Sequence, residues 1–195
     1  MRTFLKYKNW FLFGLILLIF LLYLDKKTML FVENIKSNFP QFYTYLKFLS
    51  NFVENFYKIF VVFVTILGFY NLFYKNKREG GIKIILVLLI VGVLSQVKYL
   101  LGRARPKITL ETIFTGPTKK YAYASFPSGH TFLIFAIAGI LSYFYPRYKI
   151  FFYFLAIFVA LERLLNFAHF PSDILAGAFF GTHISNFIIK QNLKT

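Results

Sequence analysis

The feature that most restricts the fold of this chain is a series of six apolar segments separated by short, mostly basic stretches. Several segments are shorter than the ~20 residues of a membrane-spanning helix, but flanking Lys, Tyr and Phe side chains can extend them. The segments cover residues 10–24, 59–74, 84–101, 131–145, 150–165 and 174–189. The pattern predicts an all-α fold, an integral membrane bundle of six transmembrane helices.

Composition supports the same prediction. Hydrophobic residues make up 58% and aromatic residues 22% of the 195 positions. A soluble domain of this size has too little interior to bury so much apolar surface, whereas lipid can solvate it. We therefore expect residues 1–195 to form a single membrane-embedded domain. The chain has no Cys, which excludes disulfides and thiol catalysis.

The net charge of +16 raises the question of a nucleic-acid partner. The basic residues lie in short clusters between apolar runs, which favours membrane flanks and anionic lipid head groups, so we expect no nucleic acid. Four short basic stretches share one face if there are six spans, and we predict that this face is cytoplasmic. They contain Arg2, Lys6 and Lys8; Lys75, Lys77, Arg78 and Lys83; Arg147 and Lys149; and Lys190 and Lys194. No small-residue cleavage site follows the first segment, which predicts an uncleaved spanning helix.

A polar stripe follows one side of residues 42–58, between the first two apolar segments. Its apolar positions have helical spacing, at Phe42, Leu46, Leu49, Val53 and Phe56, and Lys47, Asn51, Glu54 and Lys58 lie opposite. We expect an amphipathic helix on the outer membrane surface. The alternative is a solvent-facing helix packed on its own loops.

Three short stretches combine polar residues that look out of place in so apolar a chain. They are "KYLLGRARP" at 98–106, "PSGH" at 127–130 and "RLLNFAHFPSD" at 163–173. With six spans, the 102–130 and 166–173 loops emerge on the same face. Eight side chains can then meet at one membrane surface: Lys98, Arg105, Ser128, Gly129, His130, Arg163, His169 and Asp173.

The residue types in this cluster suit a phosphate group. Lys98, Arg105 and Arg163 are too many cations to leave unpaired near lipid, and Arg binds phosphate oxygens in a fork. Ser128 can donate a hydroxyl hydrogen bond. Gly129 allows its backbone N–H to approach closely, and the helix that begins there adds a positive dipole end.

The two histidines suit group transfer. Pro171 favours a helix start between His169 and Asp173, so the carboxylate could orient one ring nitrogen and leave the other free to attack phosphorus. His130, on the other loop, could protonate the leaving oxygen.

The three stretches together resemble the signature of the type 2 phosphatidic acid phosphatase superfamily, over roughly residues 84–190. The resemblance implies a metal-independent phosphatase that works through a phosphohistidine, without a cofactor. It implies three catalytic residues, His169 as nucleophile, Asp173 as its orienter and His130 as general acid. It implies phosphate binding by Lys98, Arg105, Ser128, Gly129 and Arg163. The third motif usually opens with Ser-Arg, and here it is Glu162-Arg163, which leaves the role of Glu162 open.

Other polar residues are expected to have structural roles. We interpret Arg103, Lys107, Lys119 and Lys120 as interfacial anchors. His183 lies ten residues beyond Asp173, about 15 Å deeper at helical rise, and is expected to make a structural polar contact. Gly177 and Gly181 are expected to permit close helix packing.

The resemblance and the apolar segments together imply a lipid phosphatase of the bacterial inner membrane, with several helices crossing the bilayer and its site on the periplasmic or outer face. The expected partners are the bilayer and a lipid phosphate monoester or pyrophosphate, with no obligatory protein partner. The resemblance suggests lipid A 1-phosphate, which we favour, and phosphatidylglycerol phosphate and undecaprenyl pyrophosphate are alternatives. Transfer of the phosphoryl group to a second lipid is another alternative. An anion transporter would belong to a different class, but it predicts charges spread through the helices, whereas here they gather at one end.

Overall fold

The computed structural model describes the backbone of residues 2–192 and the side chains of residues 8–192. These residues form helices and no β-strand, which confirms the all-α prediction. The helices are α1 (Arg2–Ile19), continued by a π-helical stretch (Phe20–Leu24), α2 (Asp25–Asn38), α3 (Pro40–Leu72), α4 (Arg78–Leu94), α5 (Lys98–Leu101), α6 (Gly129–Phe144), α7 (Lys149–Leu165) and α8 (Pro171–Ile189). Short 3₁₀ turns lie at Lys75–Lys77, Ser95–Val97, Tyr121–Tyr123 and Pro146–Tyr148.

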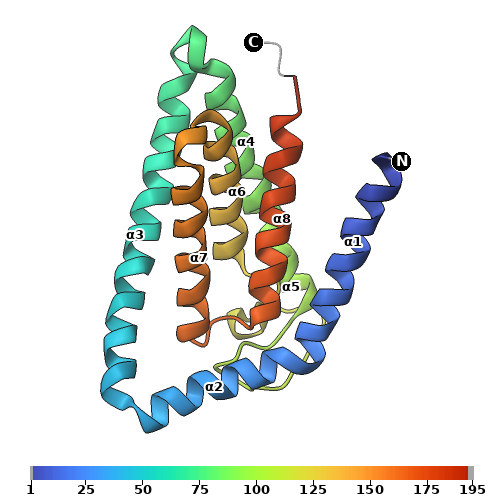
Figure 1. The fold of residues 1–195 in the computed structure, drawn as a ribbon, viewed down its shortest axis with the longest axis vertical. Coiled ribbons are helices and arrows are strands. Elements are labelled where there is room, and N and C mark those ends of the chain that lie inside the picture. Colours follow the sequence, from blue (N-terminus) through green and yellow to red (C-terminus); the bar gives the residue numbers. More distant parts are fainter. Residues whose placement is uncertain (1, 193–195) are drawn as a thin grey trace.

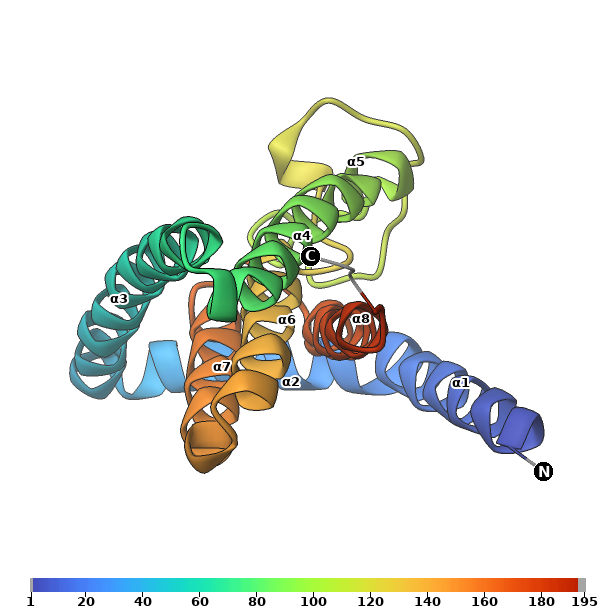
Figure 2. The same ribbon diagram turned by 90° about the horizontal axis from the view of Figure 1, so that it is seen from above.

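Helix α6 lies at the centre of the bundle, with α3, α4, α7 and α8 around it, while α1 leans away (Figures 1 and 2). Buried Ile137 and Ile140 of α6 pack with Val64 and Val87 from the neighbouring helices.

Helices α6 and α8 pack closely because α8 carries glycines on the facing side. A Cβ atom on Gly177 would come within 2.7 Å of the Ser128 carbonyl oxygen. One on Gly181 would come within 2.4 Å of the Phe132 carbonyl oxygen. Such distances are too short for an added carbon, which confirms the packing role predicted for both glycines.

All six predicted apolar segments lie in helices, apart from residues 73–74 and Tyr145, and many of their large apolar side chains face outward. Phe63, Leu89 and Phe154 are each more than half exposed. Among the described residues, two helical stretches are long and apolar enough to cross a bilayer, Pro40–Leu72 and Lys75–Leu101. The apolar helix Gly129–Phe144 is shorter. Six membrane crossings therefore stay a prediction.

The prediction that residues 42–58 form a separate surface helix is wrong. Residues 42–58 form the first half of α3, a 33-residue helix, and α2 is the helix that crosses beneath the bundle (Figure 1). The break lies at Phe39, with φ −129° and ψ 61°, because Pro40 disfavours helical backbone in the residue before it and starts the next helix. Part of the polar stripe faces α7: Lys47 contacts Asn166 and Glu54 contacts Arg163, whereas Asn51 and Lys58 are exposed.

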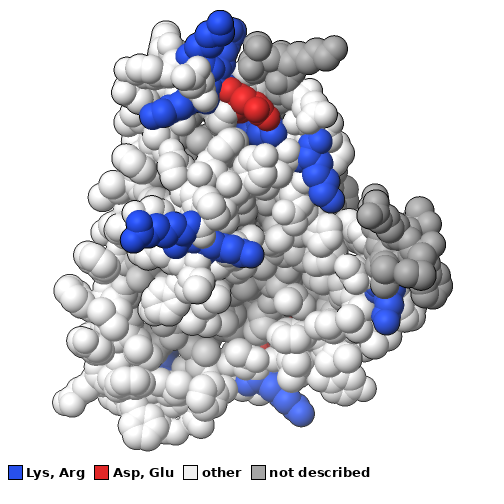
Figure 3. All heavy atoms as spheres, turned by 45° about the horizontal axis from the view of Figure 1, so that its top comes forward, with Lys and Arg blue, Asp and Glu red and all other residues white. Residues whose placement is uncertain are grey.

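The end of the bundle opposite α2 carries the basic stretches at 75–83 and 146–149 and Lys190. The α3–α4 turn, the α6–α7 turn and the end of α8 lie there, and Figure 3, in which this end comes forward, shows many blue side chains and little red. Lys83 is buried at this end, where it pairs with Glu79 at 2.6 Å and donates to the Ile189 carbonyl at 2.9 Å. The side chains of Arg2, Lys6 and Lys194 lie outside the described residues.

Candidate active site

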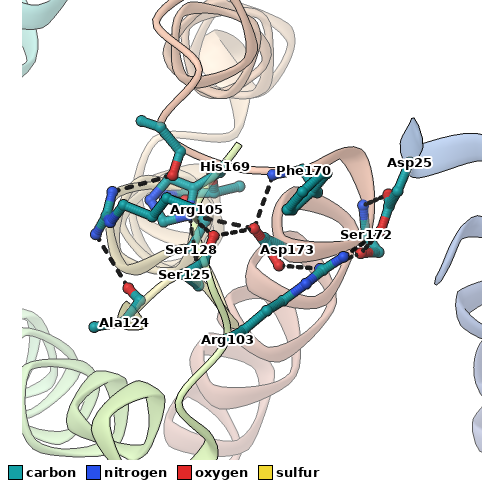
Figure 4. Close-up of polar contacts among 12 residues, drawn as sticks. Asp25, Arg103, Arg105, Ala124, Ser125, Ser128, His169, Phe170, Ser172 and Asp173 are labelled. Carbon is teal, nitrogen blue, oxygen red and sulfur yellow. Dashed lines mark hydrogen bonds and ion pairs between the residues drawn. The ribbon is translucent and has the colours of Figure 1, made fainter. Parts of the chain in front are cut away.

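The three predicted stretches meet at the lower end of the bundle, above α2 (Figures 1 and 4). The backbone N–H of Ser128 donates to the carbonyl of Asp173 at 3.0 Å, which joins the second stretch to the third. Arg105 of the first stretch donates to the Ala168 carbonyl at 3.1 Å. The structure therefore brings the loops before α6 and α8 together, as the spacing of the motifs predicts.

His169 is held by a backbone carbonyl. Its Nδ1 atom lies 2.8 Å from the Ser125 oxygen, and the side chain is buried (Figure 4). Because a carbonyl only accepts, Nδ1 carries the proton, and Nε2 keeps its lone pair. Burial lowers the pKa of His169, against the opposing effect of the Asp173 carboxylate, so the neutral imidazole is favoured. A neutral ring with a free Nε2 is the form that a nucleophile requires.

Asp173 lies farther from His169 than the Ser125 carbonyl does. Its Oδ2 atom is 3.6 Å from His169 Nδ1. The same oxygen accepts from the Ser125 hydroxyl at 2.5 Å and from the Phe170 N–H at 2.8 Å, which caps α8. Asp173 therefore holds the ring mainly through Ser125 and the loop, whereas we expected a direct contact.

Arg105 makes three hydrogen bonds to backbone carbonyls. It donates to Tyr121 at 3.0 Å, Ala168 at 3.1 Å and Ala124 at 3.0 Å, and it stacks on the Tyr121 ring at 3.9 Å. Since guanidinium has five N–H donors, two remain. Arg105 thus joins the loop before α6 to the residue preceding His169, and only part of its binding capacity is left for an anion.

Ser128, Gly129 and Lys98 lie around the first turn of α6. The Ser128 hydroxyl lies 3.0 Å from the Thr131 hydroxyl and 3.5 Å from the Thr131 N–H, so Ser128 is the N-cap. A Cβ atom on Gly129 would lie 3.5 Å from Lys98 Nζ, which shows that the ammonium reaches the start of this helix. The His130 ring packs near Tyr57, with their centroids 4.8 Å apart. An ammonium and a helix N-terminus together form a setting that favours an anion.

Comparison with known proteins identifies the family. Residues 80–195 match the family model described as the PAP2 superfamily. The chain belongs to this superfamily. It is similar to lipid A 1-phosphatase of Rhizobium etli, with 37% identity over 87 residues, 43% of this chain and 38% of that protein. It is also similar to lipid A 1-phosphatase of Porphyromonas gingivalis, with 35% identity over 94 residues, 46% of this chain and 18% of that protein. These matches therefore span less than two fifths of the curated relatives' length.

Two solved structures share the fold. Aquifex aeolicus LpxE is 27% identical, with a TM-score of 0.57, over 74% of this chain and 87% of that one. The first transmembrane PAP2-type phosphatidylglycerolphosphate phosphatase from Bacillus subtilis is 23% identical, with a TM-score of 0.66, over 92% of both chains.

Glu162, at the position where the PAP2 motif usually has Ser, holds the neighbouring arginine. The Glu162 carboxylate is buried and accepts hydrogen bonds from Nε and Nη2 of Arg163. It also accepts from the Asn166 amide, and the Ser50 hydroxyl lies 3.4 Å away. Glu54 of α3 lies 3.4 Å from Arg163 Nη2. The carboxylates of Glu162 and Glu54 therefore contact Arg163, and an incoming phosphate would compete with them.

The interpretation of Arg103 as an interfacial anchor is wrong. Its side chain is fully buried, forms an ion pair with Asp173, and donates to Asp25 Oδ2 and the Ser172 hydroxyl, each at 2.6 Å (Figure 4). Asp25 also accepts from the Ser172 N–H at 2.9 Å and hydroxyl at 2.5 Å. Burying a cation among apolar neighbours requires such counter-charges, and one of them comes from the start of α2.

Sequence reasoning missed Asp25, Ser125 and Ser172. An acid directly after the first apolar segment was the one available signal for Asp25, whereas the two serines carried none. His183 lies away from the cluster: its Nδ1 is 2.8 Å from the Phe179 carbonyl, and its ring packs against Trp10 and Phe179. These contacts confirm its predicted structural role.

Proposed function

We propose that this chain is a metal-independent lipid phosphatase that works through a phosphohistidine on His169. The observation that carries the proposal is the hydrogen bond from His169 Nδ1 to the Ser125 carbonyl at 2.8 Å. It leaves Nε2 as the nucleophilic atom of a buried, neutral ring. The membership of the PAP2 superfamily and the names of the relatives supply the reaction class.

The proposed reaction has two steps. His169 Nε2 attacks phosphorus, the bond from phosphorus to the lipid oxygen breaks, and His130 gives that oxygen a proton. Water then attacks the phosphohistidine with its proton passing to His130, and inorganic phosphate leaves. Lys98, Arg163 and the remaining N–H groups of Arg105 neutralise the phosphoryl oxygens, together with Ser128 and the Gly129 N–H. Asp173 positions His169 through Ser125.

The proposed substrate is a membrane lipid with a phosphate monoester or pyrophosphate, with its tails in the bilayer. We favour lipid A 1-phosphate because two of the similar proteins carry that name. Release of phosphate across a panel of lipid phosphates tests this choice. Faster hydrolysis of phosphatidylglycerol phosphate or undecaprenyl pyrophosphate would replace it.

Activity is expected to survive excess EDTA and to fall with vanadate. In the proposed mechanism side-chain cations neutralise the phosphoryl group, and vanadate mimics the five-coordinate transition state that they stabilise. The measurement is phosphate release in detergent with each reagent. Loss of activity on chelation that added Mg²⁺ restores would overturn the metal-free mechanism.

We propose that the chain crosses the inner membrane several times and that the site faces the periplasm. The α3–α4 turn, with exposed Lys77, and the 102–128 loop, with exposed Lys119, lie toward opposite ends of the bundle (Figure 1). The chain has no Cys, so an introduced one is unique. Lys119→Cys should react with an impermeant maleimide on intact cells, and Lys77→Cys only after permeabilisation. The reverse pattern would place the site in the cytoplasm.

A further inference from the structure

A cavity of about 780 Å³ opens beside the candidate active site, and no step of the proposed reaction uses it. It lies between α2, the start of α3, the 106–110 loop and the turn after α7. Its polar lining includes Lys36, Lys47, Lys107, Glu33 and Asn166, and Phe167 also borders it.

The charge of this cavity is unbalanced. Three lysines against one glutamate leave a formal charge of 3 − 1 = +2 on its lining. Lys36 and Lys107 are exposed, and Lys47 is half-buried and donates to the Asn166 side-chain oxygen. Like-charged ammonium groups around one hollow repel each other, and a phosphate or carboxylate between them removes the repulsion. The lining therefore favours an anionic ligand.

Residues that line the cavity lie next to the reaction centre in the chain and form hydrogen bonds toward it. Asn166 contacts Lys47 on the cavity side and the Arg163 partner Glu162 on the other. Phe167 has a positive φ of 51°, and its carbonyl accepts from the Lys107 N–H at 3.2 Å. His169 follows two residues later. A left-handed backbone at a bulky residue is strained and is typical of functional sites.

We propose that this cavity binds a second phosphate group on the head group of the lipid whose first phosphate is cleaved. The inference rests on the proposed function, and it deepens that function because it makes the chain selective for head groups with two separate anions. Arg163 and Lys47 lie on the two sides of Asn166, so one head group can meet both sets of cations. A single phosphate at His169 would leave the cavity lining with its net charge of +2.

The same anionic chemistry could come from a neighbouring lipid in the bilayer, and the experiment separates the two sources. The substrates are lipid A with phosphates at both ends of its disaccharide, and the same lipid with only the phosphate that is cleaved. Rates are measured in a non-ionic detergent, with and without added phosphatidylglycerol. The variant is Lys36→Gln with Lys107→Gln. The matched control is Lys119→Gln with Lys120→Gln, which removes the same charge from exposed positions outside the cavity.

The expected result is a fall of roughly 10-fold in the ratio of kcat/KM for the doubly to the singly phosphorylated lipid. Two partly exposed ion pairs of about 0.5–1 kcal/mol each have this effect. The control pair should keep the ratio within about two-fold, since neither lysine lines the cavity. Equal losses on both lipids, or the same loss in the control, would overturn the proposal. The proposal would also be overturned if phosphatidylglycerol activates the cleavage of both lipids equally and this activation disappears in the Lys36→Gln, Lys107→Gln variant.

Binding to a His169→Ala chain separates this inference from the proposed function, because it needs no turnover. The doubly phosphorylated lipid should bind roughly 10-fold more tightly, and Lys36→Gln with Lys107→Gln should remove the difference. If the parent chain cleaves neither lipid while the His169→Ala chain shows this binding preference, the phosphatase proposal is refuted and the cavity proposal is supported. If the parent chain cleaves both lipids and the His169→Ala chain binds both with equal affinity, the cavity proposal is refuted and the phosphatase proposal is supported.

Discussion

Replacing His169 with alanine is expected to abolish the phosphoenzyme with every substrate. The loss in kcat should be several orders of magnitude, because the covalent route disappears entirely. His130→Ala should remove only proton donation, typically worth ~10²–10⁴-fold. Its penalty should shrink on a lipid analogue with a nitrophenyl leaving group, which departs without a proton, and shrink partly on a pyrophosphate. The measurement is kcat/KM for both variants on good and poor leaving groups, with trapping of the phosphoenzyme.

The fold of these variants needs its own control, since His169 is buried against the Ser125 carbonyl. His169→Gln keeps a polar side chain that can still donate to this carbonyl, so it should melt near the parent temperature while remaining inactive. The roles of nucleophile and general acid would be exchanged under one outcome. In that outcome His130→Ala lowers kcat/KM equally on both leaving groups, and the better leaving group restores activity to His169→Ala.

The position of the candidate site could be predicted because each of its motifs is a short stretch at the end of an apolar segment. Lys98 lies near the end of one apolar segment, and Ser128 and His169 lie just before two others. Two helices, α6 and α7, separate the loop that contains Ser128 from the loop that contains His169. Geometry then requires these loops to share a face. The chemistry followed from residue type, because a histidine beside several cations suits a phosphoryl group.

The contacts that hold the site together could not be predicted, because their partners are far apart in the chain. Arg103 and Asp25 are 78 positions apart, and Ser125 and Asp173 are 48 apart. No local pattern marks such a pair. Arg103 looked like many arginines at a membrane edge, and only the packing of α2 under α8 shows why it is buried.

The polar stripe at 42–58 was detected correctly, but the surroundings of two of its four residues were assigned wrongly. Periodicity shows that one face of a helix is polar, and it does not show whether that face meets water or the polar side chains of another helix. Here Lys47 and Glu54 contact Asn166 and Arg163, whereas Asn51 and Lys58 are exposed. Two other signals could have indicated where α3 starts and that it is long: the Phe39-Pro40 pair and the absence of Gly or Pro between 41 and 67.

Arg103→Met is expected to destabilise the fold and remove most activity. The arginine separates two fully buried carboxylates, those of Asp25 and Asp173, and its loss leaves both without a counter-charge. Breaking a buried pair in this way costs about 3–5 kcal/mol, which corresponds to a fall in Tm on the order of 10 °C. Thermal melting in detergent measures the change. Lys120→Met, an exposed control in the same loop, should alter the free energy of unfolding by less than about 0.5 kcal/mol.

Asp25→Asn distinguishes a buried charge network from ordinary packing. Alone, it should lower Tm, because Arg103 loses one of its two carboxylate partners. In the Arg103→Met background it should raise Tm, because it removes a buried carboxylate that no longer has a cation. Residues in one network show coupling energies of about 0.5–3 kcal/mol, enough to reverse the sign of a single substitution. If the two substitutions simply add, α2 is held under the site by packing, and the ion pair between Arg103 and Asp25 contributes little to stability.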